Sequence, residues 1–201
     1  MMSINRIQQL LQHEAEAVLN IPVNDTFDNA VELIYSQVHQ KKGKLVASGM
    51  GKAGQIAVNI ATTFSSTGTP AIFMHPSEAQ HGDLGVLQEN DVLFLISNSG
   101  KTKEIVDLVH LADRLVNNIP MILVTSNLEG ELKEFANVVI STGNPKEVCA
   151  LGLTPTTSTT TMTVIGDILV VLLMEKIGFT AEDYAKRHHG GYLGERSRAM
   201  K

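Results

Sequence analysis

Five short runs of apolar residues, separated by segments long enough to form helices, constrain the fold of this chain more than any other feature. The runs cover residues 45–47, 71–74, 92–96, 121–124 and 138–140. They are apolar throughout rather than alternating, which is typical of strands covered by helices on both faces. The sequence therefore predicts an α/β fold, with a doubly wound, five-stranded parallel sheet in a three-layer αβα sandwich.

The segments around these runs have the apolar spacing of amphipathic helices. A first helix is expected from Ile4 to near Ile21, and further helices over residues 28–40, 52–65, 102–116, 129–136 and 157–176. The most apolar stretch, residues 164–174, is far shorter than the ~20 residues that span a bilayer. It is interpreted as a buried helix, and no membrane partner is expected.

Length and charge limit the class of protein. A chain of 201 residues is expected to form one domain over 1–201, with N-terminal helices in 1–43, an α/β core in 44–178 and a tail in 179–201 that contributes to the site. The net charge of -5 provides no evident basic face for a phosphate backbone. Nucleic acid is therefore not an expected partner.

The single cysteine, Cys149, excludes an intramolecular disulfide framework and fits a reducing compartment. Because no activating base is evident beside it, Cys149 is interpreted as a small buried side chain rather than a nucleophile. The N-terminus has no basic region followed by an apolar stretch, so no signal peptide is predicted. We expect a cytoplasmic location.

Ligands of open α/β sheets bind at the carboxyl ends of the strands, so the residues after each apolar run are the candidates for a site. The first run leads into residues 48–54, a glycine-rich turn that opens a helix and contains Lys52. Such a turn lets the backbone and the helix N-terminus approach an anion. It lacks the spacing of a P-loop, and a tight turn without a ligand is the alternative.

The third run leads into a second polar loop, residues 97–102. The hydroxyls of Ser97, Ser99 and Thr102 converge there on a helix start, and we predict that they bind phosphate. Helix capping by Ser99 or Thr102 is the alternative, although it leaves the other hydroxyls unused. Farther along, a threonine-rich tract over residues 154–161 can cap a helix and contact substrate hydroxyls.

These stretches together resemble the sugar isomerase (SIS) domain family and, within it, the arabinose-5-phosphate isomerases. The segments that carry the resemblance extend over nearly the whole chain: residues 49–52, 66–70, 75–85, 97–104, 145–147, 156–160 and 188–191. The resemblance implies interconversion of D-ribulose 5-phosphate and D-arabinose 5-phosphate, for the biosynthesis of Kdo and lipopolysaccharide.

The resemblance also implies roles for particular residues. The catalytic positions fall on Lys52, Glu104, Glu147 and His188. The resemblance and the loops above together place substrate binding on Ser48, Gly49, Gly51, Gly68, Thr69, His81, Ser97, Asn98, Ser99 and Thr102. His75 matches a position where zinc binds without being needed for catalysis, so no cofactor is expected to be required and zinc would be inhibitory. Members are typically homotetramers whose sites are completed by a neighbouring subunit, with His188 as a candidate donor.

The chain departs from the family pattern at three places. It stops at Lys201, where many relatives continue into paired CBS domains. Lys101 and Lys103 stand where the usual loop has an acid and a small residue, and they either assist the phosphate or are solvated. His189 replaces a proline. These differences bear on ligand preference more than on reaction type.

Isomerisation through an enediol needs a base with a pKa near the working pH. Burial can raise the pKa of Glu147 toward that range, with Glu104 and His188 as the other candidates, while Lys52 would stabilise the enediolate. A surface pair of Lys52 with Glu104, and a capping role for His188, are the non-catalytic alternatives. Two other functions stay open: a non-catalytic sensor of a sugar phosphate or Kdo-pathway ligand, and an isomerase of another ketose phosphate.

Overall fold

The computed structural model describes residues 4–199. Residues 1–3 and 200–201, which the expected domain range includes, lie outside the described part. Five parallel strands form one sheet in the order β2-β1-β3-β4-β5. The strands are β1 (Leu45–Gly49), β2 (Ala71–Phe73), β3 (Val92–Ile96), β4 (Met121–Thr125) and β5 (Val138–Ser141). The predicted α/β class and five-stranded parallel sheet are confirmed.

Helices connect and cover the strands. They are α1 (Ile4–Leu19), α2 (Thr26–Ile34), α3 (Gly51–Ser66), α4 (Pro76–Ala79), α5 (Lys103–Leu115), α6 (Thr157–Ile177), α7 (Ala181–Arg187) and α8 (Gly191–Ala199), with a π-helix η1 (Tyr35–Gln40) and 3₁₀ turns η2 (Asp83–Val86) and η3 (Glu131–Phe135).

Two of these elements differ from the sequence-based prediction. The helix expected over residues 28–40 changes to π geometry at Tyr35, where the Ser36 hydroxyl donates to the Leu33 carbonyl and competes with the α-helical hydrogen bonds. The helix expected over residues 129–136 is only η3. Gly130 is extended and packs backbone to backbone on Gly100, so the turn begins after it.

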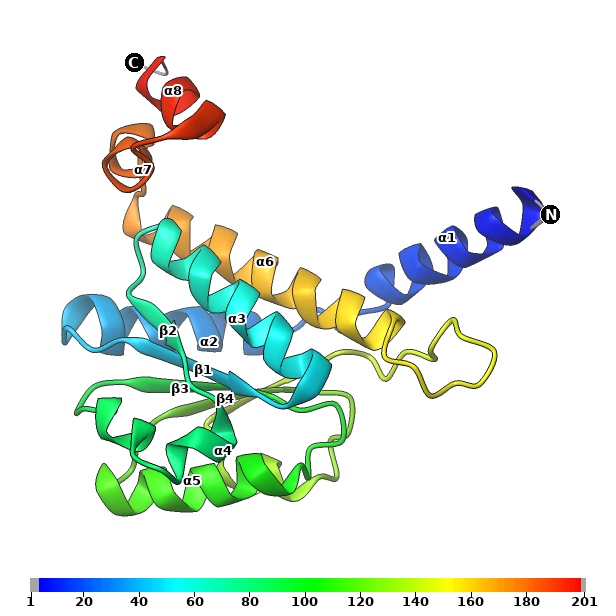
Figure 1. Ribbon diagram of the computed structural model, residues 1–201, viewed down its shortest axis with the longest axis horizontal. Helices are drawn as coiled ribbons and strands as arrows, with labels where there is room; N and C mark the ends of the chain where they lie inside the picture. The colour runs from blue at the N-terminus through cyan, green and yellow to red at the C-terminus, as the bar shows by residue number, and fades with distance from the viewer. Residues whose placement is uncertain (1–3, 200–201) are drawn as a thin grey trace.

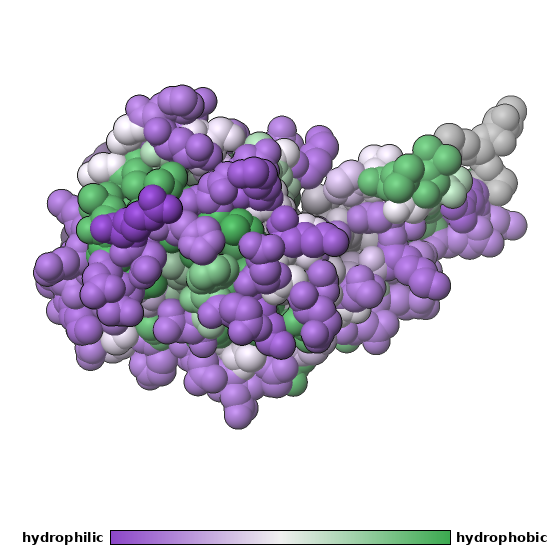
Figure 2. Space-filling model, turned by 90° about the horizontal axis from the view of Figure 1, so that it is seen from below, coloured by the Kyte–Doolittle hydropathy of each residue, from purple (hydrophilic) through white to green (hydrophobic). Residues whose placement is uncertain are grey.

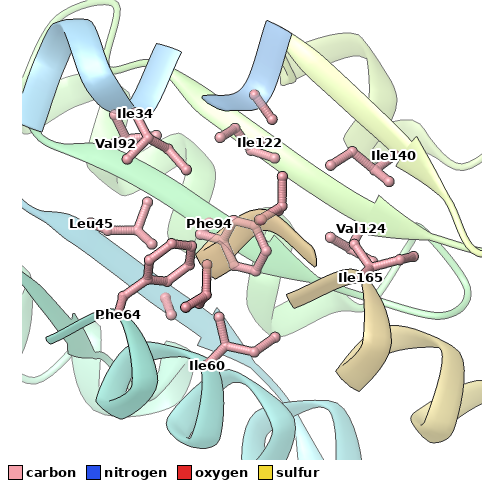
Figure 3. Close-up of a cluster of buried hydrophobic side chains, with 14 of the residues drawn as sticks. Ile34, Leu45, Ile60, Phe64, Val92, Phe94, Ile122, Val124, Ile140 and Ile165 are labelled. Carbon is pink, nitrogen blue, oxygen red and sulfur yellow. The ribbon is translucent and has the colours of Figure 1, made fainter. Parts of the chain in front are cut away.

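The sheet separates two hydrophobic layers. In Figure 1, α2, α3 and α6 lie on one side of the strands, and α4 and α5 on the other. The first layer is built around Phe64 and Phe94, which are fully buried, with branched side chains from the strands and helices around them (Figure 3). The second layer packs α5 and η3 against the opposite face of the strands. This is the expected three-layer sandwich.

Helix α6 is long and apolar enough to cross a membrane by length and composition alone. Half of its most hydrophobic window is buried inside the protein. Met162, Ile165, Leu169 and Leu173 pack into the first layer, so α6 is a core helix. Its other side leaves Val171 half exposed.

The two ends of the described chain leave the sandwich in different directions (Figure 1). Helix α1 projects beyond the N-terminal end of α6 and has no buried residue. Helices α7 and α8 follow the opposite end of α6. Since a helix rises about 1.5 Å per residue, the 21 residues of α6 separate the two ends by roughly 30 Å.

Candidate active site

A pocket of about 240 Å³ lies at the carboxyl edge of the sheet. It is lined by Met50, Lys52, Ala53, Ile96, Ser97, Asn98, Ser99, Thr102, Pro155, Ser158, Thr159 and Met162. Most of these residues come from the first turns or preceding loops of α3, α5 and α6, while Ile96 ends β3 and Met162 lies in the second turn of α6. Each helix N-terminus carries unpaired amides and partial positive charge, so the pocket suits an anion.

The loop after β1 brings Lys52 to this pocket. Gly51 has φ of 57°, in the left-handed region, which lets the chain turn sharply from Met50 into α3. A Cβ at Gly49 would come within 2.9 Å of the Ala53 backbone, so this glycine allows α3 to start close to the strand. Lys52 is exposed on the pocket wall, and no ion pair within residues 4–199 joins it to Glu104. The expected alternative of a surface pair is not seen.

Ser48, a predicted substrate-binding residue, is held within the fold by a hydrogen bond. Its side chain is fully buried, and its hydroxyl donates to the Met74 backbone oxygen at 2.7 Å, which ties β1 to the segment after β2. Ser48 is the penultimate residue of β1, and its hydroxyl points to the backbone that follows β2. Ser48 does not line the pocket, and its hydroxyl is used by the backbone, so substrate binding by Ser48 stays a prediction.

The loop after β3 contributes four of the predicted residues to the pocket. The hydroxyls of Ser97 and Thr102 are 2.8 Å apart and hydrogen-bonded to each other. Thr102 occupies the N-cap position of α5, but its side chain makes no capping hydrogen bond. Capping by Thr102 therefore does not explain its hydroxyl. Lys103 points away from this arrangement and pairs with Asp107 on the surface, which raises the pKa of Lys103.

Residues after β4 and β5 hold this loop in place, and the sequence analysis missed them. The Ser126 hydroxyl donates to Asn98 Oδ1 at 2.5 Å and is hydrogen-bonded to the Thr142 hydroxyl at 2.6 Å. Asn127 Nδ2 donates to the Ser99 backbone oxygen at 2.9 Å. The same strand-end rule that singled out residues 97–102 applies to Ser126 and Asn127 and would have found them.

Glu147 is held by the N-terminus of α6. Its Oε2 accepts hydrogen bonds from the Thr156 amide at 2.7 Å, the Thr156 hydroxyl at 2.8 Å and the Ser158 amide at 3.3 Å, and its Oε1 accepts from the Ser158 hydroxyl. Burial raises the pKa of Glu147, but the hydrogen bonds from Ser158 and Thr156 outweigh it, so the pKa lies below the ordinary 4.5. The expectation of a raised pKa is wrong, because the threonine-rich tract stabilises the charged form.

Ser158 links Glu147 to the pocket. It lines the pocket, is 2% exposed, and donates its hydroxyl to the carboxylate. The pocket therefore has a side rich in hydroxyls around Ser97 and Thr102 and, through Ser158, a neighbouring carboxylate.

Three other predicted residues lie after strand ends but do not line the pocket. Glu104 is partly buried in the first turn of α5, and His81 is exposed between α4 and η2. His75 caps α4, where its Nδ1 accepts from the Ser77 amide at 3.3 Å.

His75 does not form a zinc site with its neighbours in this chain. Protein zinc sites use three or four His, Cys, Asp or Glu ligands. Among residues 4–199, no group of three such side chains is placed to hold a metal ion, and one ring nitrogen of His75 already caps a helix. The residues present do not fit zinc.

A second group of predicted residues lies at the opposite edge of the sheet. Gly68 and Thr69 precede β2, and the Thr69 hydroxyl is hydrogen-bonded to His39 at 3.0 Å. Gly68 packs against the Phe179 ring beyond α6. His188 ends α7, stacks on Tyr184 at 3.8 Å between ring centroids, and its Nδ1 donates to the Tyr184 backbone oxygen at 3.1 Å. One chain does not bring these residues to the pocket.

Cys149 differs from its expected environment. It is partly exposed, and its Sγ accepts from the Thr154 amide at 3.3 Å. This hydrogen bond is the main cause that lowers the thiol pKa from 9.0 to about 7; burial opposes it, and the amides of Leu153 and Leu151 add to it. The prediction of a buried side chain is wrong, because the loop leaves Cys149 partly exposed, and the backbone amides lower its pKa without a neighbouring base.

A larger cavity, about 350 Å³, lies between the end of α6 and helices α7 and α8. Its lining is mainly apolar and includes Phe179, Tyr184 and Leu193, with Arg196 at one side. The hydroxyls of Thr180 and Ser197 also line it, but they donate to Asp183 and to the Gly194 backbone oxygen, so this cavity fits a sugar phosphate less well than the smaller pocket.

Comparison with known proteins identifies the family of this chain. The SIS domain matches residues 37–172, which include β1 to β5 and most of α6. The chain belongs to the SIS domain family. The arabinose 5-phosphate isomerase KdsD of Yersinia pestis is 44% identical over 191 residues, which are 94% of this chain and 56% of that relative. The chain thus spans little more than half the length of this curated relative.

Two solved structures match this chain over nearly their whole length. A Bacteroides fragilis protein described as a candidate phosphosugar isomerase involved in capsule formation has 66% sequence identity and a TM-score of 0.93, covering 94% of this chain and 98% of that one. The c3406 protein of Escherichia coli CFT073 was solved in complex with arabinose 5-phosphate. It has 34% sequence identity and a TM-score of 0.85, and the match covers 92% of this chain and 96% of that one.

Proposed function

We propose that this SIS domain is an aldose-ketose isomerase that interconverts D-ribulose 5-phosphate and D-arabinose 5-phosphate in the cytoplasm, for Kdo and lipopolysaccharide biosynthesis. The observation that carries the proposal is the pocket in which Lys52, the hydroxyls of residues 97–102 and the N-termini of three helices meet next to Glu147. The names of the relatives, and the arabinose 5-phosphate bound to the E. coli protein, support this choice of substrate.

In the proposed complex, the phosphate lies against Ser97, Ser99 and Thr102. Hydroxyls and helix N-terminal amides can donate several hydrogen bonds to its oxygens. Lys52, on the other wall of the same pocket, then lies where it can stabilise negative charge on an enediolate oxygen. The reaction only moves protons within one molecule, so it calls for no redox cofactor.

Glu147 is proposed as a proton acceptor in the anionic form. Its lowered pKa ensures that the carboxylate is ionised at neutral pH, which a base requires, although the same hydrogen bonds weaken its basicity. A second proton-transfer group is therefore expected. His188 is the candidate, contributed by another subunit, because its own chain holds it beyond the far end of α6.

Subunit association is part of the proposal. Helix α1 exposes Ile4, Ile7 and Leu11 by 74%, 50% and 65%, and Figure 2 shows hydrophobic surface on this projecting helix. Exposed apolar surface of this kind favours association with another molecule. A homotetramer with shared sites would cover it and place a tail beside a pocket.

The test is incubation with D-ribulose 5-phosphate and detection of D-arabinose 5-phosphate, with hexulose and heptulose phosphates as competing substrates. Lys52→Met should lower kcat by about 100-fold or more, as expected for loss of a charge-stabilising group. Lys103→Met, which removes a lysine paired outside the pocket, is the control. Sugar-phosphate binding without turnover of any substrate would favour a sensor instead.

A further inference from the structure

Helix α1 contacts the chain on both sides of Glu147. His13 Nε2 is 2.9 Å from the Lys146 backbone oxygen, 133 positions away in sequence. Since a carbonyl oxygen only accepts, this ring nitrogen is the donor. On the other side of Glu147, the Val148 amide donates to Thr157 Oγ1 at 3.2 Å, and the Thr157 hydroxyl donates to Glu14 Oε1 at 2.9 Å. Two consecutive residues of α1 thus hold the residues before and after Glu147.

Hydrogen bonds rather than packing define this contact. A cavity of about 270 Å³ separates α1 from residues 143–146, with His13, Ala17 and Lys146 among its lining residues. Because side chains do not fill this space, packing alone does not fix the position of the segment. Gly143, with φ of 81°, adds one backbone contact to the turn after α1, since a Cβ there would lie 2.9 Å from the Asn20 oxygen.

Glu14 places at this contact a buried carboxylate oxygen without a hydrogen-bond partner in the described chain, which a purely structural contact would not require. Its Oε1 accepts from the fully buried Thr157, whereas its Oε2 is buried without a hydrogen-bond partner among the described residues. Leaving a carboxylate oxygen in that state opposes folding. Exceptions of this kind to polar pairing are expected mainly at functional sites.

Thr157 lies between the two residues that bind the Glu147 carboxylate. Thr156 and Ser158 donate to the carboxylate, while Thr157 turns the other way, toward α1. We propose that His13 and Glu14 of α1, acting through Lys146 and Thr157, are positioning residues that fix the Glu147 carboxylate relative to the pocket. The inference rests on the proposed function for Glu147, whereas the hydrogen bonds of His13 and Glu14 are independent of that function.

Kinetics test the proposal in the full chain. Glu14→Ala and Thr157→Val should each lower kcat by roughly 10- to 100-fold, as expected for a displaced catalytic group, with KM changed by less than about 2-fold, because the phosphate loop is untouched. Glu14→Gln should retain most of kcat, since its amide oxygen still accepts from Thr157. In a Glu147→Gln background, Glu14→Ala should cause little further loss. The matched control is Gln12→Ala, which removes only an exposed hydrogen bond on the same helix.

Backbone hydrogen exchange provides a readout that does not depend on activity. Peptides covering residues 143–156 should exchange faster in Glu14→Ala and Thr157→Val than in wild type and Gln12→Ala, with α5 peptides unchanged. Unchanged exchange and unchanged kcat in both variants would overturn the proposal. It would also be overturned if Glu14→Ala lowered kcat by the same factor in the Glu147→Gln background as in wild type. If the wild-type protein turns over no sugar phosphate, the proposed function fails. The exchange experiment alone then decides whether α1 holds residues 143–156 in place.

Discussion

Thr156 donates both its backbone amide and its hydroxyl to the same oxygen of Glu147, at 2.7 and 2.8 Å. The pair joins a loop carboxylate to the N-terminus of the longest helix, where a negative charge is favoured. Glu147 is therefore both the candidate proton acceptor and the group that satisfies the first amides of α6. Its ionisation should affect folding as well as chemistry.

Stability should depend on pH through Glu147. Because its folded-state pKa lies below the ordinary 4.5, the folded protein binds fewer protons than the unfolded chain. This stabilisation is present above pH 4.5 and is lost as pH falls through the lower folded value. Glu147→Gln should thus be less stable than wild type in urea unfolding at neutral pH, with the difference shrinking in acid. For the exposed control Glu89→Gln, the difference in unfolding stability from wild type should be the same at neutral and acid pH.

Substitutions in the phosphate loop should affect binding more than turnover. Thr102→Val and Ser99→Ala each remove one hydroxyl from the pocket. A hydrogen bond to a charged group contributes about 1.5–3 kcal/mol, so KM should rise by roughly 10-fold or more while kcat changes little. Steady-state kinetics and inhibition by inorganic phosphate measure this. A fall in kcat at constant KM would contradict the assignment of the loop to phosphate.

Gly51 should stabilise the fold through its left-handed backbone conformation, and not because a side chain there would clash with its surroundings. No atom lies within 4 Å of a Cβ built there, but its φ of 57° is unfavourable for alanine. Gly51→Ala should lower the free energy of unfolding by about 1–2 kcal/mol. Gly85→Ala is the matched control, because Gly85 is equally open and has no positive φ. Equal stability of the two variants would contradict the prediction.

Cys149 should react as a thiolate near neutral pH. Its pKa of about 7 predicts that the rate of alkylation by iodoacetamide rises through a midpoint near pH 7, rather than near the ordinary 9.0. Stopped alkylation at several pH values, read by mass spectrometry, gives the midpoint. A midpoint near 9.0 would show that the loop amides do not stabilise the thiolate in solution.

Mixed subunits should test the shared site. If His188 acts in the pocket of another subunit, Lys52→Met and His188→Ala chains, each of low activity alone, should regain part of the activity when they are refolded together. The reason is that some sites then receive an intact pocket from one chain and an intact tail from another. Activity no higher than that of the separate variants would indicate that each chain completes its own site.

Much of the architecture follows from local sequence. The wholly apolar runs at β1, β3 and β4 identify buried parallel strands, because only strands covered on both faces exclude polar residues from both sides. The carboxyl-end rule then led to Lys52, Ser97 and Thr102, which do meet in one pocket. The same rule, applied strictly, would have placed Gly68 and Thr69 at the other edge, since they precede β2.

Tertiary structure alone decided the chemistry around these residues. The sequence determined that Glu147 precedes a threonine-rich tract, but its pKa depends on which hydroxyls point toward it once α6 begins at Thr157. The link from His13 to Lys146 spans 133 positions and has no sequence pattern. Periodicity and propensity report on neighbours along the chain, whereas hydrogen bonds and burial depend on distances that only packing brings about.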